Sequence, residues 1–230
     1  MPDYLDVTYS DKRAPKGGYP LQLAEYLEKK YFRPPGKLLD VGCGRGDFLE
    51  AFDQLGYTTY GLDKYVLSDN WENVAEIDLE KDVFPHEDEL IEYIFSKSVV
   101  EHLQDPTVLL GEAYRVLEYG GRIVIMTPSW EHTYKSAFYV DHTHVTPFTP
   151  ISLQGVLEIA GFQDVTVDYF YQLPFVWKTP ALKILAQAIS LLPLPYAPNK
   201  KAPWKVSSKI NKLLRFSKEP MLLATGTKKL

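Results

Sequence analysis

The sequence has a single cysteine, Cys43, among its 230 residues, so no disulfide can form within the chain. This is typical of proteins in a reducing compartment. A membrane-spanning helix needs about 20 apolar residues, and the longest apolar stretch, 181–195, is shorter and contains Lys183 and Gln187. The first residues carry acids and tyrosines, where a signal peptide has a basic start and an apolar run. We therefore expect a cytoplasmic protein, with peripheral membrane association left open.

Acidic residues are almost missing from the last quarter of the chain. Residues 171–230 contain 11 Lys and Arg and only Glu219 as an acid, a balance of +10, whereas residues 1–170 contain 14 Lys and Arg and 29 Asp and Glu, a balance of −15. This asymmetry indicates an anionic partner for the basic end, or a basic end that packs on its own acidic body. Nucleic acid is not an expected partner, because the main body is acidic and no recognition motif is present.

The rest of the composition is that of an ordinary globular chain, with 45% hydrophobic and 24% charged residues. Strand-like and helix-like segments alternate from Leu38 onward, a pattern typical of a parallel sheet covered by helices on both faces. The expected strands are 37–41, 58–62, 74–77, 92–97, 122–127, 165–171 and 221–225. The expected helices are 23–31, 105–117 with a stop at Gly120 and Gly121, 149–160 with a stop at Gly161, and two insertion helices near 179–192 and 206–215.

The most informative segment is Leu38–Phe52, which combines an apolar strand, a glycine-dense turn and an amphipathic helix. Its glycines, Gly42, Gly44 and Gly46, have the spacing G-x-G-x-G and not the G-x-G-x-x-G of dinucleotide-binding folds. Glycines in such a turn let the backbone approach a ligand with no Cβ in the way. Asp40 precedes the turn, where a carboxylate suits a cationic ligand better than a diphosphate.

This turn resembles the first motif of the class I S-adenosylmethionine-dependent methyltransferases. Three further segments agree with that family in the same order: 60–65 at the second strand, 98–103 after the fourth and 115–128 around the fifth. The resemblance covers about 38–162 and implies S-adenosyl-L-methionine as the cofactor. It also implies an α/β fold: a Rossmann-like, seven-stranded, mostly parallel sheet with helices on both faces and a helical insertion between the last two strands.

On this interpretation the chain has four parts. They are an amino-terminal lid or helix at 1–36, a cofactor-binding core at 37–172, a basic helical insertion at 173–217 and a last strand at 218–230. The insertion is too long and too periodic for a simple loop. Cationic residues opposite Leu and Ile in 179–215 are typical of a helix that lies on an anionic membrane. A lid over the core or a homodimer surface is the alternative.

The resemblance implies a set of cofactor-binding residues at the turn and at the ends of strands. They are Asp40, Gly42, Cys43, Gly44, Gly46, Asp63, Asp78, Leu79, Ser96 and Lys97. Asp63 follows Gly42 by 21 residues, close to the spacing of about 20 at which an acid binds two ribose hydroxyls. The alternative for Asp63 is a cap at the end of a strand.

For the remaining positions the implied contacts are more specific to the family. Asp78 and Leu79 are implied to contact the adenine, and the backbone near Ser96 and Lys97 the methionine part. A solvated loop acid is the alternative for Asp78. We interpret Cys43 as a small turn residue and not as a nucleophile, because no activating base is near it in the sequence.

Three histidines are candidates for a general base that removes a proton from the acceptor. These are His144, His142 and His102, all expected in loops at the carboxyl edge of the sheet. A base with a pKa near neutral accelerates such a step by about 10²- to 10⁴-fold. The alternative is structural: His142 and His144 would organise the loop before the helix at 149–160 by hydrogen bonding, and His102 would support the fold.

A metal site has to be weighed as well. Glu101 and His102 resemble the Glu-His element of metal-dependent relatives that methylate quinone precursors or the 3′ end of small RNAs, and His142 or His144 could complete a nitrogen and oxygen site. Those relatives have another carboxylate three residues before the Glu, where this chain has Ser98. We therefore assign no metal ligand from the sequence.

The acceptor is suggested by a looser resemblance. The segments 115–121, 141–149 and 217–229 resemble methyltransferases of surface-polysaccharide, other glycan and secondary-metabolite pathways. This implies O-methylation of a sugar, glycan or related small-molecule hydroxyl, nucleotide-linked or lipid-linked. Aromatic residues near the expected acceptor mouth would stack on sugar faces or simply pack: Tyr134, Phe138, Tyr139 and Phe148. The alternatives are metal-assisted O-methylation of a quinone precursor or RNA end, and a non-catalytic binding protein on this fold.

Overall fold

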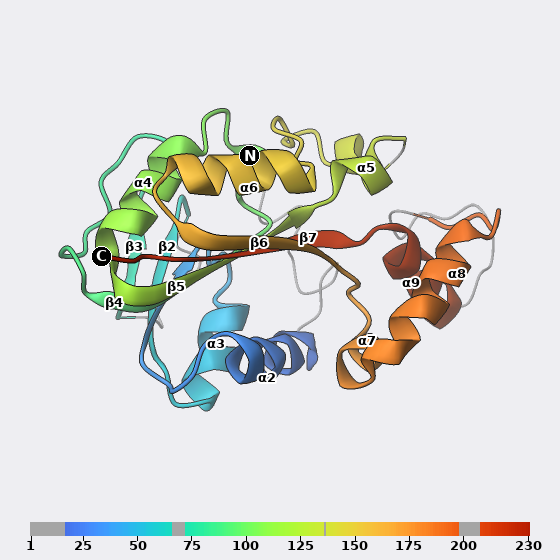
Figure 1. Cartoon of the computed structure of the whole chain (residues 1–230), viewed down its shortest axis with the longest axis horizontal. Coiled ribbons are helices and arrows are strands. Elements are labelled where there is room, and N and C mark those ends of the chain that lie inside the picture. Colours follow the sequence, from blue (N-terminus) through green and yellow to red (C-terminus); the bar gives the residue numbers. More distant parts are fainter. Residues whose placement is uncertain (1–16, 66–71, 136, 198–207) are drawn as a thin grey trace.

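The computed structural model describes residues 17–65, 72–135, 137–197 and 208–230. Its centre is one seven-stranded sheet in the order β3-β2-β1-β4-β5-β7-β6 (Figure 1). The strands are β1 (Lys37–Val41), β2 (Thr58–Asp63), β3 (Val74–Glu76), β4 (Ile91–Lys97), β5 (Leu117–Pro128), β6 (Gln163–Phe170) and β7 (Met221–Thr227). Only β7 runs antiparallel to its neighbours. The expected seven-stranded, mostly parallel sheet is confirmed.

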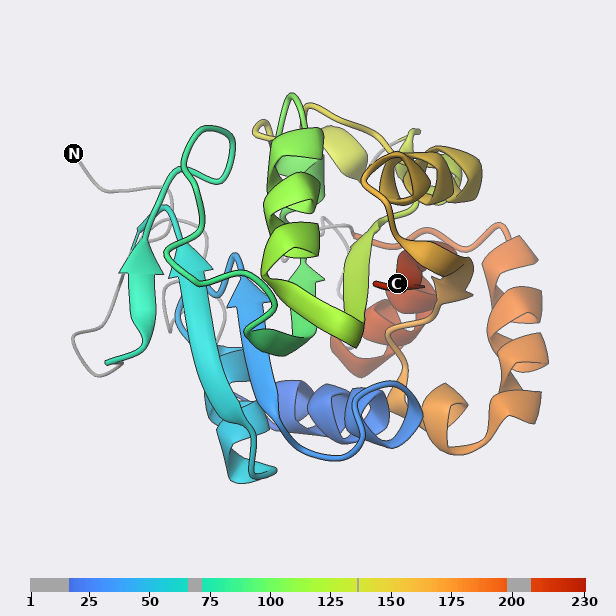
Figure 2. The same cartoon turned by 60° about the vertical axis from the view of Figure 1, so that its left-hand side comes forward.

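Helices cover both faces of this sheet (Figures 1 and 2). One face carries α2 (Tyr19–Lys30) and α3 (Asp47–Gln54), and the other carries α4 (Thr107–Val116) and α6 (Pro150–Ile159). Side chains alternate between the two faces of a strand, so the consecutive residues Leu38 and Leu39 belong to different cores. Leu38 packs with the α2 and α3 side, and Leu39 with the α4 and α6 side.

Local signals in the sequence set the helix ends as expected in two places. Thr149 Oγ1 accepts a hydrogen bond from the Ser152 backbone N–H at 3.2 Å, which caps α6, and Gly161 follows this helix with a φ of +102°. Before α4, the Asp105 carboxylate accepts from the Thr107 backbone N–H at 2.9 Å. These contacts satisfy amide groups that a helix start leaves without an intrahelical partner.

The expected helix stop at Gly120 and Gly121 is wrong. α4 ends at Val116, and both glycines lie inside β5, which starts at Leu117. Gly120 has a φ of +86°, and a Cβ at Gly121 would lie 2.9 Å from the Glu118 carbonyl oxygen. The two glycines therefore allow an irregular backbone at the start of β5, where its pairing register with β4 shifts.

Between β6 and β7 the chain forms the expected helical insertion. It consists of α7 (Pro174–Lys178), a short 3₁₀ turn η3 (Pro180–Leu182), α8 (Lys183–Leu191) and α9 (Ser208–Lys218). The first expected helix, near 179–192, is present as η3 followed by α8, and it begins at Thr179 and Pro180 as expected. The short helix α7 before them was not expected, and it ends where proline cannot continue it. Val206, expected in the second helix, lies outside the described residues. Buried Tyr171, Leu173, Val176 and Ala186 form a small separate core for the insertion.

The insertion lies beyond the carboxyl edge of the sheet. Phe170 at the end of β6 and Pro128 at the end of β5 both pair with Met221, the first residue of β7. In Figure 1, α8 and α9 accordingly stand at the end of the molecule where β5 ends. At the amino terminus, the expected helix is present as α2, which packs under the sheet, while residues 1–16 of the expected lid lie outside the described part.

Candidate functional site

A cleft of about 460 Å³ opens at the carboxyl ends of β1, β2 and β4. β2 follows β1 on one side and β4 adjoins β1 on the other, so the chain order reverses here, at the kind of switch point where open α/β sheets bind ligands. The volume lies in the range of small-molecule sites. The residues that line the cleft are Gly42, Cys43, Gly44, Arg45, Asp47, Phe48, Asp63, Lys64, Tyr65, Asp78, Leu79, Glu80, Lys97, Ser98, Val99, His102, Leu103 and Thr143.

The glycine turn forms one wall of this cleft. Gly42, Gly44 and Gly46 all have a positive φ, at 82°, 53° and 77°, a region that favours glycine. A Cβ at Gly42 would lie 2.1 Å from Cγ2 of Val99, whereas a Cβ at Gly44 would meet no atom within 4 Å. Gly44 therefore presents bare backbone to the cleft, and Gly42 lets the turn pack closely on the segment after β4. Gly46 is the residue from which α3 starts.

Asp63 stands at the end of β2, beside this turn. Its Oδ2 accepts from the Gly44 backbone N–H at 2.7 Å, and its Oδ1 accepts from the Tyr65 backbone N–H at 3.1 Å. Burial raises the pKa of Asp63, while these backbone donors oppose the shift. The strand-end cap and the ligand-binding carboxylate are thus compatible, because the backbone bonds fix the orientation of a carboxylate that lines the cleft.

Asp78 and Leu79 form the neighbouring wall. The hydrogen bond from Lys81, 2.9 Å from Oδ2, is the main reason why the pKa of Asp78 falls to about 2. Oδ1 accepts from the Glu80 backbone N–H at 3.1 Å, so both carboxylate oxygens already have partners. Leu79 is buried and apolar. This side of the cleft therefore combines a fixed negative charge with an apolar surface suited to a flat ring.

Three of the expected residues lie at the base of the turn. Asp40 is buried, its Oδ2 has no hydrogen-bond partner in the described structure, and burial together with the nearby Asp63 raises its pKa to about 8. Ser96 donates to the Val41 carbonyl oxygen at 2.9 Å and does not line the cleft. Lys97 does line it; burial lowers its pKa, while the charges of Glu101 and Asp40 oppose that shift.

Cys43 also lines the cleft as a buried side chain. Burial, followed by the charges of Asp40 and Asp63, raises the pKa of its thiol. A protonated thiol is a poor nucleophile. The geometry therefore agrees with its interpretation as a small turn residue.

Of the three histidines, His102 alone lines the cleft. It lies in the short turn η1 (Val100–His102), and its Nδ1 is 2.8 Å from Thr143 Oγ1. That hydroxyl donates to Asp141 Oδ1 at 2.6 Å, so its proton is used there and the His102 Nδ1–H has to donate to it. The neutral ring then carries its proton on Nδ1 and its lone pair on Nε2. Burial and the neighbouring His144 lower the pKa of His102.

His144 lies behind His102. The two rings meet edge to face with centroids 4.7 Å apart, and Phe138 packs on His144 at 4.8 Å. His142 is exposed and belongs neither to this pair nor to the cleft lining. The structure therefore brings His102 and His144 together and leaves His142 apart from them.

Glu101, His102 and His144 form a compact cluster of metal-ligand types. One ligand atom from each lies within 4.8 Å of the others. Glu101 is fully buried, and burial raises its pKa to about 7. Its Oε2 accepts from Thr127 Oγ1 at 2.9 Å, but its Oε1 and the Nδ1 of His144 have no hydrogen-bond partner within the described residues. The sequence prediction assigned no metal ligand, whereas the structure brings these three candidate ligands together.

Several lining residues escaped the sequence prediction. Arg45 and Phe48 stand inside the glycine motif and its helix, so their place at the cleft follows from the same segment. Thr143 had no local signal, because it reaches the cleft from a loop 41 residues after His102. Ser98, which stands where metal-dependent relatives have a carboxylate, also lines the cleft with a φ of +60°.

The donor set fits S-adenosyl-L-methionine. Asp63 offers an oriented carboxylate to a sugar, Leu79 an apolar surface to a ring, and Gly44 an open stretch of backbone. The buried Asp40 carboxyl group, with its orphaned oxygen at the base of the turn, has a pKa raised to about 8, so a cationic ligand bound beside it would favour its ionised form. A cleft of this volume accommodates a nucleoside with an amino-acid tail.

Comparison with known proteins agrees with this chemistry. The profile of a family described as "Methyltransferase domain" matches residues 17–167. Phosphoethanolamine N-methyltransferase 2 of Caenorhabditis elegans is 29% identical over 123 residues, which are 47% of this chain and 28% of that protein. Malonyl-[acyl-carrier protein] O-methyltransferase of Hahella chejuensis is 32% identical over 105 residues, 40% of this chain and 37% of that protein. The chain thus spans less than half the length of these curated relatives.

Solved structures show the same fold along nearly the whole chain. A SAM-dependent methyltransferase from Archaeoglobus fulgidus has a TM-score of 0.64 and 26% identity, covering 98% of this chain and all of that one. Phosphoethanolamine N-methyltransferase 2 of Haemonchus contortus, solved with S-adenosylhomocysteine, has a TM-score of 0.62 and 16% identity, covering 100% of this chain and 60% of that one. By its glycine turn, its sheet order and the family profile that matches most of its length, this chain belongs to the class I S-adenosylmethionine-dependent methyltransferases.

Proposed function

We propose that this chain transfers a methyl group from S-adenosyl-L-methionine to a hydroxyl of a sugar or glycan. The observation that carries the proposal is the place of His102, a base candidate that lines the cofactor cleft. A hydroxyl has to lose its proton as it is methylated, whereas a neutral amine needs no base before it attacks. The hydroxyl acceptor accounts for a histidine at this position.

The cofactor residues divide the work between backbone and carboxylates. Asp63 would bind the ribose hydroxyls, held in place by the Gly44 and Tyr65 amide groups. Leu79 and Asp78 would flank the adenine, and the segment at Ser96 and Lys97 the methionine part. When bound, the cofactor supplies a methyl group on a positively charged sulfur. Positioning of the acceptor against that methyl group contributes several kcal/mol to catalysis, on the order of 7 or more in favourable intramolecular systems.

His102 would accept the hydroxyl proton on Nε2. The proton on Nδ1 is held by the chain from His102 through Thr143 to Asp141, so the lone pair on Nε2 is fixed for this task. The negative charge of Asp141 at the end of this chain would stabilise the ring once it is positively charged. Oxygen then attacks the methyl carbon, and the carbon–sulfur bond breaks to leave a neutral thioether. His144 supports the ring of His102 from behind, and His142 has no part in this arrangement.

An aromatic cluster continues from this pair toward the surface and supports a sugar as the acceptor. Phe138 packs on His144 and on Trp130, with centroids 4.8 and 5.2 Å apart, and Trp130 also contacts Tyr139 at 6.0 Å and Tyr134 at 5.9 Å. Tyr134 and Tyr139 are exposed, while Phe138 is buried. Accessible aromatic faces in a cluster that adjoins the pair of His102 and His144 are suited to stack on the apolar face of a sugar. Phe148 is buried and packs in the main core.

The test is transfer of a labelled methyl group from the cofactor to a panel of acceptors. The panel contains nucleotide-linked and lipid-linked sugars, free glycans, phosphoethanolamine, malonyl-acyl carrier protein, quinone precursors and RNA. We expect label in the sugar acceptors. Phosphoethanolamine and malonyl-acyl carrier protein are the acceptors in the names of the two relatives. If only one of them is labelled, that acceptor replaces the sugar in the proposal. If no member of the panel is labelled, a non-catalytic binding protein is favoured.

The cofactor assignment has its own test, independent of the acceptor. Asp63→Asn removes the charge that binds the ribose, and loss of two charge-assisted hydrogen bonds weakens binding of S-adenosylhomocysteine by about 100-fold or more in calorimetry. Asp53→Asn changes an exposed acid on α3 and serves as the matched control. Equal affinities in both variants would remove Asp63 from the site.

Metal-assisted O-methylation is a second candidate, favoured by the Glu101, His102 and His144 cluster and its two orphaned polar atoms. A divalent cation held there would bind and acidify an acceptor hydroxyl. Metal analysis of the purified protein decides between the two: stoichiometric metal that is lost in Glu101→Gln and kept in His142→Ala would support the cation, and a metal-free protein with full activity would eliminate it.

A further inference from the structure

We propose that one face of α8 docks the protein on the surface of an anionic lipid bilayer. This α8 face consists of Ile184, Leu185, Ala188 and Leu191, which follow the spacing i, i+1, i+4 and i+7 and therefore lie on one side of the helix. All four are exposed in the described structure, Ile184 by 73% and Leu191 by 84%. Such exposure of large aliphatic side chains along one helix marks an interaction site.

The opposite side of α8 is the side that holds the helix on the protein. Ala186 is fully buried and belongs to the small core with Tyr171, Leu173 and Val176. Lys218 of α9 donates to the carbonyl oxygens of Ser190 at 3.2 Å and Leu192 at 2.5 Å, at the carboxyl end of α8. The helix is therefore fixed in an orientation that points the α8 face away from the protein.

The charge of the surrounding segment selects an anionic partner. From Gln172 to Lys218 the sequence contains nine Lys or Arg residues and no Asp or Glu. Among them, Lys178, Lys209 and Lys212 are exposed on the neighbouring helices α7 and α9. An apolar helix face in a segment whose charged residues are all cationic is the pattern of a helix that lies in the interface of an anionic membrane.

A second copy of this chain fits the same face less well. A two-fold symmetric dimer brings the same patch of both copies together, so the Lys residues of one copy would face those of the other. A bilayer with anionic headgroups offers negative charge and an apolar interior at once. With nine residues, α8 is far shorter than the roughly 20 needed to span a bilayer, so it would lie on the surface. Across the described residues, no helix is both long and apolar enough to cross a membrane.

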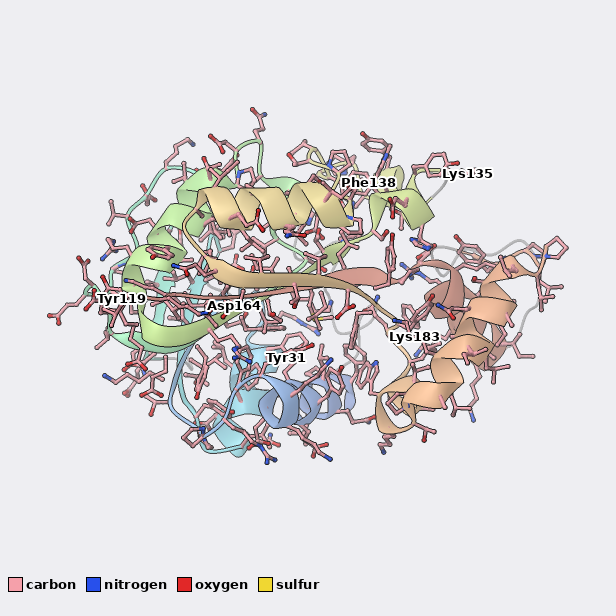
Figure 3. All side chains as sticks on the ribbon, in the orientation of Figure 1. Tyr31, Tyr119, Lys135, Phe138, Asp164 and Lys183 are labelled. Atoms are coloured by element: carbon pink, nitrogen blue, oxygen red, sulfur yellow. The ribbon has the colours of Figure 1, made fainter. Side chains whose placement is uncertain are left out.

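The α8 face lies in the same half of the molecule as the proposed acceptor region. Figure 3 labels Lys183, the first residue of α8, and Phe138 of the aromatic cluster at the end where β5 terminates, whereas Tyr119 and Asp164 mark the opposite end. Docking through α8 would thus bring the acceptor side of the protein toward the lipid surface. The docking proposal itself does not depend on the nature of the acceptor.

The test is co-sedimentation of the full chain with vesicles of phosphatidylcholine, with and without about one third phosphatidylglycerol. At about 50 mM salt we expect the protein to pellet with the anionic vesicles and to remain in the supernatant with the neutral ones. Raising the salt to about 500 mM should release severalfold more protein, because the Debye length shortens. Wild-type protein that stays in solution with anionic vesicles at low salt overturns the proposal.

Variants separate the α8 face from general hydrophobicity. Ile184→Ser/Leu191→Ser should lower vesicle binding by about tenfold or more, since two large apolar side chains no longer enter the interface. The matched control is Ile151→Ser/Ile159→Ser on α6, two isoleucines exposed by 84% and 80%, which should bind like wild type. Equal loss in both pairs contradicts the assignment of the face.

Two further measurements keep the outcomes distinct. The double variant Ile184→Ser/Leu191→Ser should bind S-adenosylhomocysteine like wild type, which would show that its fold and cofactor site are intact. Loss of vesicle binding in this variant can then be assigned to docking and not to the proposed function. Light scattering measures the oligomeric state. If the wild-type protein is a dimer that does not bind vesicles, and the double variant is a monomer, the α8 face serves self-association and the bilayer proposal is overturned.

Discussion

The two sides of the cleft are built differently. The proposed cofactor side is built mainly from one continuous segment, in which β1, the glycine turn and the end of β2 present backbone amides and the Asp63 carboxylate. Asp78, Leu79 and Lys97 are added to it from later segments. The proposed acceptor side is assembled from His102 and Thr143, which line the cleft, and continues outside the lining through His144 to the aromatic cluster around Trp130. A site built from local backbone is recognisable in the sequence, whereas a site built from distant side chains becomes visible only in the fold.

The largest expected effect lies on the acceptor side. His102→Gln removes the proposed base, so we expect kcat to fall by about 10²- to 10⁴-fold with little change in cofactor affinity. His142→Gln is the matched control, because His142 is exposed and outside the cleft lining. Steady-state kinetics with a confirmed acceptor measures both. Equal activities of the two variants would return His102 to a structural role.

The pH profile of the same reaction sharpens this assignment. Burial lowers the pKa of His102 from its usual value of 6.5, so the neutral ring that accepts a proton persists to lower pH than in a solvated histidine. The rate should therefore fall on the acid side with an inflection below 6.5 and be flat above it, until another group titrates. An acid limb above pH 7 would contradict His102 as the base.

On the cofactor side, the two glycines that open the turn should respond differently to the same substitution. Gly42→Ala and Gly44→Ala both place a Cβ at positive φ, which costs about 1 to 2 kcal/mol. Gly42→Ala also forces contact with Val99, so its total loss of unfolding free energy should reach about 2 to 4 kcal/mol. Urea denaturation checks the difference. Equal losses would mean that Val99 moves aside without cost.

The sheet and most of the cofactor side followed from the sequence for identifiable reasons. Strand and helix periodicity fixed the seven strands, and the glycine spacing located the turn that the structure places at the cleft. The stop at Gly120 and Gly121 failed, because glycine ends helices and also permits an irregular strand, and local sequence does not separate the two.

The acceptor side was predicted only in part. His102 stands in a motif next to β4, so its position at the cleft edge could be expected. His144 and His142 differ by two residues and are indistinguishable in sequence, yet one packs on His102 and the other is exposed. Thr143 and the orphaned oxygen of Glu101 depend on how the loop after α5 (Trp130–Thr133) folds back over η1, which is a property of tertiary packing.

The next effect concerns the buried acid at the base of the turn. Asp40 has a folded-state pKa of about 8, above its usual value of 3.8, so the native state retains a proton that the unfolded chain releases. Stability then falls as pH rises between about 4 and 8, and is flat outside that window.

The variant Asp40→Asn tests this slope. It should remove the pH dependence, and its free energy of unfolding should exceed that of wild type by about 1 kcal/mol or more between pH 5 and 8. Denaturant unfolding at several pH values measures it, with Asp53→Asn, which changes an exposed acid, as the control. Parallel pH curves for wild type and Asp40→Asn would show that Asp40 is ionised in the native protein.

The smallest expected effect concerns the insertion, where a side chain of α9 holds the end of α8. Lys218→Met removes the donor that binds the carbonyl oxygens of Ser190 and Leu192 at the end of α8, and we expect a loss of about 1 kcal/mol. Because α8 shares only a small core with its neighbours, most of this loss should appear as local opening. Amide hydrogen exchange should therefore speed up in α8 and stay unchanged in β1. The control is Lys212→Met, which changes an exposed residue on the same helix α9. It should leave amide exchange in α8 and α9 unchanged. If exchange in β1 rises together with α8, the insertion and the sheet unfold as one unit, and the α8 face cannot adjust to a bilayer without disturbing the cofactor cleft.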